Sequence, residues 1–312
     1  MSKFHKALIF YNEKSGQSDA AEHYTAIKTH FQKHSIEYEI IRVPIPPFEI
    51  QKFIQQGLHN GLDLVVAAGG DGTVSMVGSP LVNSEISMGI LPIGTGNLLA
   101  KELNIPLRFD KALEVLTSDA SETFAIDTIG LGQNSFLMNL SVGISSTIMG
   151  ETPSSEKQRL GFFAYLKHFI KLLFRIKMDR FTIEFDGQTI TKSASEVIIA
   201  NSRILAAQQF EWPDYVSLND GKQDLFIIRA ANFRDVLKFI ASVFTKYRIN
   251  LPIVSYYPYE KYCRIETREP RNFQADGDPI GVTPIHVEVR PQSLKIIVPA
   301  IKNIRSSNHN LI

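Results

Sequence analysis

The sequence has very little cysteine and no long apolar segment. Of its 312 residues only Cys263 is a cysteine, which excludes an intrachain disulfide framework and fits a reducing compartment. No stretch reaches the roughly 18 to 20 uncharged apolar residues of a transmembrane helix. The apolar run within MSKFHKALIFYN is too short for a signal peptide. We therefore expect a protein that is soluble, or at most bound to a membrane surface.

The sequence also lacks an excess of positive charge. Its formal net charge is +1, so nucleic acid is not attracted in bulk, and any anionic partner must be bound by local groups. No GxxxxGK[ST] phosphate loop occurs, and no complete GxGxxG follows a strand, which argues against a P-loop or a Rossmann-type dinucleotide site. Repeats of the solenoid type are absent as well.

Strand and helix patterns alternate over the first 120 residues. KALIFYN, EYEIIRV, LDLVVAA and MGILPI are typical of strands, and helices are expected at 18–34 and 48–60. Continuous apolar runs that alternate with helices predict a parallel sheet covered on both faces.

The pattern changes after about Asp127 to short strands separated by turn residues. Asp186-Gly187 lies between two such strands and predicts a hairpin, whereas NSFLMNLSVGI and QTITKSASEVIIANS each read as one strand. Helices are expected only at about 159–177 and 233–247. The chain is thus α/β followed by antiparallel β, and a cleft between two lobes is the usual place for a small-molecule site.

Three strand-to-helix turns of the first lobe are rich in small residues. These turns span residues 11–18, 68–75 and 92–99. Ligands of an open parallel sheet bind beyond the carboxyl ends of its strands, where these turns must lie. Glycine lets backbone N–H groups approach a ligand, and a helix N-terminus favours anions. Any single turn of this kind is also an ordinary helix cap. Three together, one of them with Asp71, favour a polyphosphate site.

The second lobe contributes two pairs of carboxylates. Asp220 and Asp224 surround one turn, and Asp276 and Asp278 flank Gly277. An Asp-Gly pair in a β domain is usually just a hairpin turn. Near a phosphate site, however, such carboxylates can accept a proton from an attacking hydroxyl group or bind Mg²⁺.

Several motifs together resemble those of the lipid kinases that include bacterial diacylglycerol kinases and the sphingosine and ceramide kinases. The segments that carry this resemblance are GGDGTV (69–74), LPIGTGN (91–97) and QADGDPIGVTP (274–284). NEKSG at 12–16 is similar to the first family motif, which is usually Asn-Pro-x-Ser-Gly. AIDTIGLGQNSFLMNLSVGIS (125–145), RLGFFAYL (159–166) and LNDGKQDL (218–225) follow in family order. The resemblance covers nearly the whole chain.

The resemblance implies an enzyme with two lobes. The expected fold is an NAD-kinase-like α/β lobe at 1–127, to which 297–312 return, and an antiparallel β-sandwich substrate lobe at 128–296. The expected activity is transfer of phosphate from ATP, with Mg²⁺, to the hydroxyl group of a lipid such as diacylglycerol or a sphingoid base, as in phospholipid biosynthesis. The expected location is cytoplasmic, peripheral at the inner face of the membrane.

The resemblance also implies roles for individual residues. The implied nucleotide contacts are Asn12, Ser15, Gly16, Gly69, Gly70, Asp71, Gly72, Thr73, Val74, Ser75, Gly94, Thr95 and Asn97. Asp71 would lie near the catalytic Mg²⁺ and the phosphates, and the base would be Asp276 or Asp278, where the family usually has Asp-Gly-Glu. The implied structural Mg²⁺ site is Asp220 with the carbonyls of Ser217 and Lys222, supported by Asp127 and Asp224.

The chain departs from the family pattern at four places, and alternatives stay open. Glu13 replaces the proline of the first motif, and Leu98 stands where many bacterial members have an aspartate. Asp278 stands where the family usually has a glutamate. Pro44 or a neighbour stands near the position of a threonine that contacts the nucleotide in the family. An NAD kinase-like small-molecule kinase shares GGDGT, and a non-catalytic nucleotide- or lipid-binding module is the third hypothesis. The basic helices expected at 161–177 and 233–249 either lie transiently on an anionic membrane or pack on the β lobe. A homodimer is left open.

Overall fold

The described part of the chain divides into two units. The computed structural model describes residues 3–16, 20–144, 177–204, 212, 215–235, 238 and 252–300. The first unit contains the described residues up to 126 together with 292–300, and the second contains those between 127 and 291. Most of the two helices expected at 159–177 and 233–247 lies outside the described residues. Among the residues that are described, no helix is long and apolar enough to cross a membrane.

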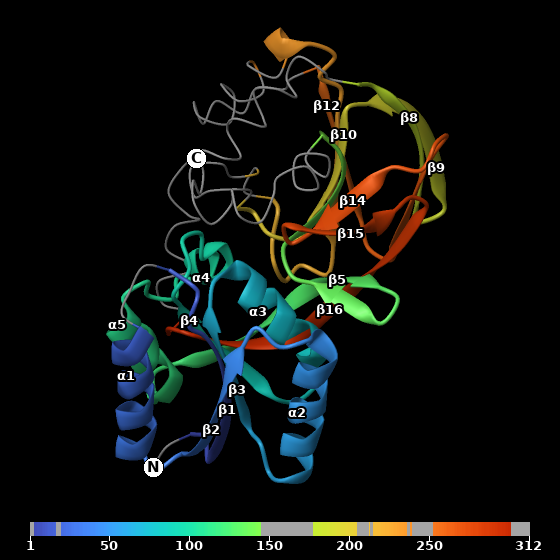
Figure 1. Ribbon diagram of the computed structural model, residues 1–312. Helices are drawn as coiled ribbons and strands as arrows, with labels where there is room; N and C mark the ends of the chain where they lie inside the picture. The colour runs from blue at the N-terminus through green and yellow to red at the C-terminus, as the bar shows by residue number, and fades with distance from the viewer. Residues whose placement is uncertain are drawn as a thin grey trace. The chain divides into compact units, whose positions relative to one another are not determined.

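The first unit is a parallel sheet with helices on both faces, as its sequence predicts. Its strands are β1 (Lys6–Asn12), β2 (Glu37–Val43), β3 (Leu64–Gly69) and β4 (Ser87–Pro92). Its helices are α1 (Ala20–Lys33), α2 (Pro47–His59), α3 (Asp71–Gly78), the short 3₁₀ helix η1 (Ser79–Leu81), α4 (Leu98–Glu102) and α5 (Phe109–Thr117). The helices α1 and α5 cover one face, and α2 and α3 cover the other (Figure 1). Every residue of β3 is therefore buried.

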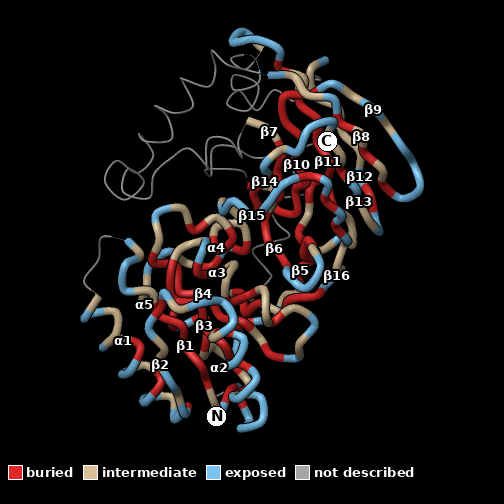
Figure 2. Tube along the Cα trace, turned by 45° about the vertical axis from the view of Figure 1, so that its right-hand side comes forward, coloured by how far each residue is buried: buried red, intermediate tan, exposed pale blue. Residues whose placement is uncertain are grey.

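Apolar periodicity explains how these helices attach to the sheet. Helix α2 buries Ile50 and Ile54, which are one turn apart, and α1 buries Ile27 and Phe31 at the same spacing. Each such side chain contributes roughly 1.5–3 kcal/mol when it is removed from water. The buried residues run along β1, β3 and β4, while the outer helix faces are exposed (Figure 2).

The strand order places a ligand site at one edge of this sheet. The order is β2-β1-β3-β4, all parallel, and the end of β16 (Ile285–Val298) joins β4 with Ile296 opposite Met88. After β1 the chain moves to β2 on one side, and it then returns to β3 on the other side of β1. The carboxyl ends of β1 and β3 thus lie at a topological switch point, where open α/β sheets bind their ligands.

The second unit is built from antiparallel strands in two sheets. Its strands are β5 (Glu122–Leu131), β6 (Asn134–Phe136), β7 (Asn139–Gly143), β8 (Asp179–Phe185), β9 (Gln188–Ala194), β10 (Glu196–Ala200), β11 (Gln223–Ile228), β12 (Val254–Tyr259), β13 (Tyr262–Thr267), β14 (Asn272–Ala275), β15 (Asp278–Val282) and the start of β16. One sheet has the order β12-β11-β10-β7-β14-β15, and the other contains β16-β13-β8-β9. Both β5 and β16 run through the boundary between the units.

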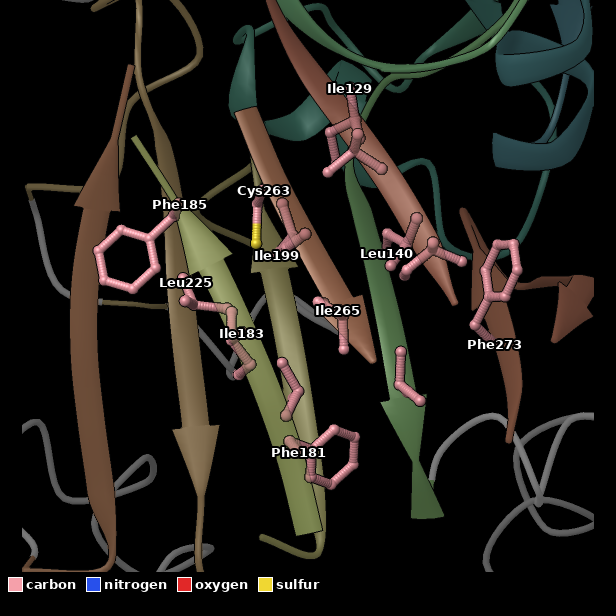
Figure 3. Close-up of a cluster of buried hydrophobic side chains, with 14 of the residues drawn as sticks. Ile129, Leu140, Phe181, Ile183, Phe185, Ile199, Leu225, Cys263, Ile265 and Phe273 are labelled. Atoms are coloured by element: carbon pink, nitrogen blue, oxygen red, sulfur yellow. The ribbon is translucent and has the colours of Figure 1, made fainter. Parts of the chain in front are cut away.

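The core of the second unit consists of alternate side chains from the two sheets. Ile183 of β8 and Ile265 of β13 come from one sheet, and Leu140 of β7 and Leu225 of β11 come from the other (Figure 3). Cys263 lies in this core with none of its surface exposed, and burial raises the pKa of its thiol far above the usual range. Cys263 is therefore a core residue of the second unit.

Two of the strands expected in this unit are wrong in extent. The segment 188–200 is not one strand, because Ser195 separates β9, which pairs with β8, from β10, which pairs with β7 and β11. The Ser195 N–H and hydroxyl groups both donate to the carbonyl of Ile228, at 2.9 and 3.1 Å, where the chain passes between sheets. NSFLMNLSVGI likewise divides into β6 and β7. The hairpin at Asp186-Gly187 is confirmed, with φ angles of 44° and 81°.

The contact between α1 and α5 predicts a pH-dependent stability. The His30 Nε2 lies 2.9 Å from Oγ1 of Thr117, and His34 is adjacent. Burial lowers the pKa of His30 from 6.5 to about 4, with help from the charges of His34 and Lys33 and against that of Glu114. Because the unfolded chain binds the proton more tightly, the stabilisation is complete above the unfolded pKa and is lost as the pH falls toward 4.

We expect the free energy of unfolding to fall by about 1 kcal/mol more in the unchanged chain than in His30→Gln between about pH 7.5 and pH 5, after discounting for the half-exposed ring. Urea denaturation at the two pH values measures this difference. Parallel pH dependence of the two proteins would contradict the assigned pKa shift of His30.

Candidate active site

Direct contacts hold the three glycine-containing turns of the first unit together. The side-chain amide of Asn12, at the end of β1, donates to Oγ1 of Thr73 in the second turn at 3.0 Å. The N–H of Ile93, just after β4, donates to the carbonyl of Gly69 at 3.0 Å. The predicted nucleotide residues of these turns are therefore brought together at the carboxyl edge of β1, β3 and β4.

Glycine is required where the turns approach one another. Gly16 has a φ of +78°, and a Cβ atom added there would overlap the carbonyl oxygen of Ile93. A Cβ atom on Gly94 would overlap the Cα of Gly70. The turns therefore meet backbone to backbone, and the surface between them is made of peptide groups.

Helix α3 begins in the middle of this surface. Its N-cap, Gly70, is extended with φ −92° and ψ −174° and makes no side-chain capping hydrogen bond. The first amide groups of a helix lack intrahelical partners and carry a partial positive charge. Among the described residues, a Cβ atom on Gly72 would meet no atom within 4 Å, so in this part of the chain the approach to these amides is open. An anion fits at this helix start.

Asp71 connects the second turn to the third. Its Oδ1 accepts the N–H of Leu98 at 2.6 Å, which caps the start of α4, and a Cβ atom on Gly96 would overlap its Oδ2. Burial raises the pKa of Asp71, while hydrogen bonds from the amides of Leu98, Asn97 and Leu99 lower it. The sequence indicated a carboxylate that faces phosphate or metal, and the structure adds a positioning role for one of its oxygens.

Asn97 leaves an acceptor in the site without a partner. It adopts a left-handed φ of 49°, and its Nδ2 donates to the carbonyl of Gly94 at 2.7 Å. Its Oδ1 is buried and has no hydrogen-bond partner among the described residues. A buried acceptor without a donor is costly, so this atom fits a ligand that supplies an N–H or O–H group. Thr95, at the tip of the same turn, is exposed.

The two candidate bases of the second unit lie in different environments. Asp276 has a φ of 49° in the turn between β14 and β15. Its carboxylate accepts the N–H groups of Leu137, Met138 and Asn139 at 2.8, 2.9 and 3.1 Å. Three backbone donors occupy most of its lone pairs, so Asp276 holds the segment 137–139 in place.

Asp278 instead begins β15 as an exposed residue. Its carboxylate makes no hydrogen bond or ion pair within the described part of the chain. A carboxylate that is not bound to backbone donors keeps its lone pairs available for a substrate proton. The geometry therefore favours Asp278 over Asp276 as a proton acceptor.

The predicted structural metal site lies in the turn that precedes β11. Asp220 is exposed, and its Oδ1 accepts the N–H of Lys222 at 3.1 Å. The N–H of Gly221, with φ 76°, donates to Oδ2 of buried Asp127 at 2.8 Å, and Ser217 is in the same turn. The described residues contain no group of three or more His, Cys, Asp or Glu side chains able to hold a metal ion. A site with one carboxylate and two carbonyls is of another kind and stays a prediction.

Asp224 is buried in β11, which directly follows this turn. Burial raises the pKa of Asp224 to about 6, a hydrogen bond from Tyr256 lowers it, and the charge of Asp220 raises it. The Tyr256 hydroxyl donates to Oδ1 at 2.7 Å, whereas Oδ2 has no partner among the described residues. The carboxylates of Asp224, Asp276 and Asp278 all belong to the second unit, and the nucleotide residues all belong to the first.

Two contacts of the turns were not predicted from the sequence. Glu13 of the first turn pairs with Arg42 of β2, with Nε and Oε1 2.9 Å apart. Neither this pair nor the bond from Leu98 to Asp71 follows from local sequence patterns, because the partners are 29 and 27 positions apart. The hydrogen bonds of Asp276 to backbone N–H groups could have been predicted from the sequence, because an Asp-Gly turn with positive φ places the carboxylate beside backbone donors.

The close approach at Gly16 leads to a stability prediction with a matched control. Gly16→Ala introduces both the strain of a positive φ, roughly 1–3 kcal/mol, and an overlap with the carbonyl of Ile93. Gly61 has the same φ of +78°, but a Cβ atom there meets no atom of the described residues within 4 Å. We expect Gly16→Ala to destabilise the chain more than Gly61→Ala in chemical denaturation, and to weaken ATP binding in calorimetry. Equal effects of the two substitutions would contradict the contact between the first and third turns.

Comparisons with known proteins match both units. The family described as "Diacylglycerol kinase catalytic domain" matches residues 6–129, and the "YegS C-terminal NAD kinase beta sandwich-like domain" matches 139–298. An uncharacterised protein of Synechocystis sp. is 28% identical over 303 residues, which cover 93% of this chain and 70% of that protein. "Probable lipid kinase YegS-like" of Citrobacter koseri is 26% identical over 304 residues, 96% of this chain and 98% of the relative.

Solved structures show the same fold. A chain described as a diacylglycerol kinase from Bacillus anthracis str. Sterne aligns with a TM-score of 0.77 and 22% identity, and the alignment covers 96% of this chain and 98% of that one. The expected combination of an α/β lobe with a β-sandwich is thereby confirmed.

Proposed function

Because the chain belongs to the family of lipid kinases with a diacylglycerol kinase catalytic domain and a YegS-type β-sandwich domain, we propose that it transfers the γ-phosphate of ATP to the hydroxyl group of a lipid, with Mg²⁺. The single observation that carries the nucleotide part is the set of three turns joined backbone to backbone at the switch point of the parallel sheet. Diacylglycerol and sphingoid bases are the lipid classes that we propose as acceptors.

The nucleotide would be held by the first unit. We assign the phosphates to the N-terminus of α3, with its open approach at Gly72, and to the hydroxyl groups of Ser15 and Thr95. The free Oδ1 of Asn97 would accept a hydrogen bond from the nucleotide. ATP supplies the phosphoryl group, and Mg²⁺ neutralises the charge on its phosphates. Asp71, which lies in the second turn and accepts the N–H of Leu98 with Oδ1, would hold this ion and also keep the third turn in place.

The acceptor hydroxyl would be activated by the second unit. Asp278 would take the proton from the lipid hydroxyl group. The hydroxyl oxygen of the lipid would form a bond to the γ-phosphorus, and the bond from that phosphorus to the β–γ bridging oxygen would break. The products are a lipid phosphate and ADP, and the proton remains on Asp278 until water removes it. Asp276 would act indirectly, because its carboxylate fixes the backbone at 137–139.

Product analysis tests the proposal directly. Purified protein is incubated with [γ-³²P]ATP, Mg²⁺ and vesicles that contain diacylglycerol, sphingosine or ceramide, and the products are separated by thin-layer chromatography. The expected result is one labelled lipid phosphate that does not form without Mg²⁺. Transfer of label to NAD, included as a further acceptor, would instead support the NAD kinase-like alternative. Tight ATP binding without any labelled product would support a non-catalytic module.

A lipid acceptor requires contact with a bilayer, so we further propose transient peripheral binding at the cytoplasmic face. The support is the sequence of the two basic segments, 161–177 and 233–249, most of which lies outside the described residues. Sedimentation with anionic and with zwitterionic vesicles at low salt tests this, and equal binding to both would contradict it.

A further inference from the structure

One ion pair stands beside the nucleotide turns of the first unit. Glu13 belongs to the first turn, and Arg42 lies near the end of β2, opposite Tyr11 of β1. Their Oε1 and Nε atoms are 2.9 Å apart. The guanidinium group of Arg42 also lies 5.4 Å from the ring centre of Tyr24, which restricts its orientation. This pair has no role in the mechanism above.

The three turns contain more acidic than basic residues, which is unfavourable for binding a triphosphate. The segments 11–18, 68–75 and 92–99 contain one basic residue, Lys14, and two acidic ones, Glu13 and Asp71. The backbone amides that line the site carry only partial charge. Arg42 is a cation beside the first turn, because it is on the strand adjacent to β1 and is already bound to Glu13 of that turn. A polyanion would therefore meet Glu13 as a repulsive group unless Arg42 compensates it.

Building on the proposed function, we propose that Arg42 is a phosphate-binding residue of the nucleotide site, which Glu13 holds when no nucleotide is bound and releases when the triphosphate arrives. The exchange is easy, because the side chains of Arg42 and Glu13 are 66% and 39% exposed and an exposed ion pair contributes little to stability. A guanidinium group binds phosphate oxygens in pairs, so Arg42 gains a better partner than one carboxylate oxygen. Glu13 then sets the affinity for nucleotide by competing for Arg42.

Calorimetric titration with Mg·ATP at low salt tests this competition. Glu13→Gln removes the competing charge but keeps the size of the side chain, so we expect the dissociation constant to fall about three- to tenfold. We expect the double variant Glu13→Gln/Arg42→Gln to bind no more tightly than the unchanged chain, and Arg42→Gln alone to bind more weakly. The gain from Glu13→Gln should shrink at about 0.5 M salt, because exposed charges are then screened.

Glu39→Gln is the matched control. Glu39 is exposed on β2 and its side chain is outside the turns, so the same loss of charge should leave the dissociation constant unchanged. Melting temperatures of all variants should agree, since the ion pair is exposed. An unchanged or higher dissociation constant for Glu13→Gln, with labelled lipid still formed, would overturn this inference alone. Absence of Mg·ATP binding by the unchanged chain would overturn the inference together with the proposed function.

Discussion

Asp278→Asn is expected to lower the rate of phosphoryl transfer at least ~100-fold, because a positioned carboxylate that accepts a proton typically contributes ~10²- to 10⁴-fold. Asparagine has nearly the same shape but cannot take the proton at neutral pH. Asp278 is exposed and makes no hydrogen bond within the described part of the chain, so the fold should not change. Turnover of labelled lipid, melting temperature and ATP affinity measure these three properties separately, and only the first should move.

The neighbouring carboxylate provides the contrast. Asp276→Asn replaces an acceptor of three backbone N–H groups by an amide that accepts with one oxygen only, so we expect a lower melting temperature. Asp186 accepts the N–H groups of Glu260, Lys261 and Tyr262 in the same manner, and Asp186→Asn should lose stability but keep its turnover. If Asp276→Asn is stable and inactive while Asp278→Asn is active, the proton acceptor is Asp276 and the assignment made here is wrong.

The architecture could be predicted from sequence where hydrophobic period and local turn chemistry agree. The continuous apolar runs of β3 and β4 predicted a parallel sheet, and Asp186-Gly187 predicted the hairpin between β8 and β9. The break at Ser195 could not be predicted, because β-branched and apolar residues continue on both sides of it. That break depends on which sheet each half pairs with, and pairing is a long-range property that a local pattern does not contain.

The site could be predicted in composition but not in detail. Glycines at strand ends mark positions where the backbone approaches a ligand or another segment closely. The contact between Gly94 and Gly70 shows that here the backbone approaches another turn. Sequence spacing left Asp276 and Asp278 equivalent, since both flank Gly277. Only the hydrogen bonds to residues 137–139, far away in sequence, separate them. The ion pair of Glu13 and Arg42 is likewise a tertiary contact between adjacent strand ends.

Asp71→Asn is expected to lower phosphoryl transfer on the order of 10³-fold, since removal of one charge-stabilising group at a reacting centre has an effect of this size. Asparagine keeps an oxygen that can accept the N–H of Leu98, so the third turn should stay in place. Asp71→Ala also removes that acceptor, and α4 then begins without its cap. We therefore expect Asp71→Ala to lose turnover and, in addition, to bind ATP more weakly than Asp71→Asn does.

Comparison of the two substitutions separates the charge of Asp71 from its positioning role. Asp63 is the control, because its carboxylate accepts the N–H groups of His5 and Lys6 at 2.8 and 2.9 Å in the same unit, away from the turns. Asp63→Asn should alter the melting temperature without changing turnover per folded molecule. If Asp71→Asn retained near-normal turnover while Asp71→Ala did not, Asp71 would be a helix cap only. The charge at the second turn would then have no part in phosphate transfer, and the carboxylate that organises Mg²⁺ would have to come from another residue.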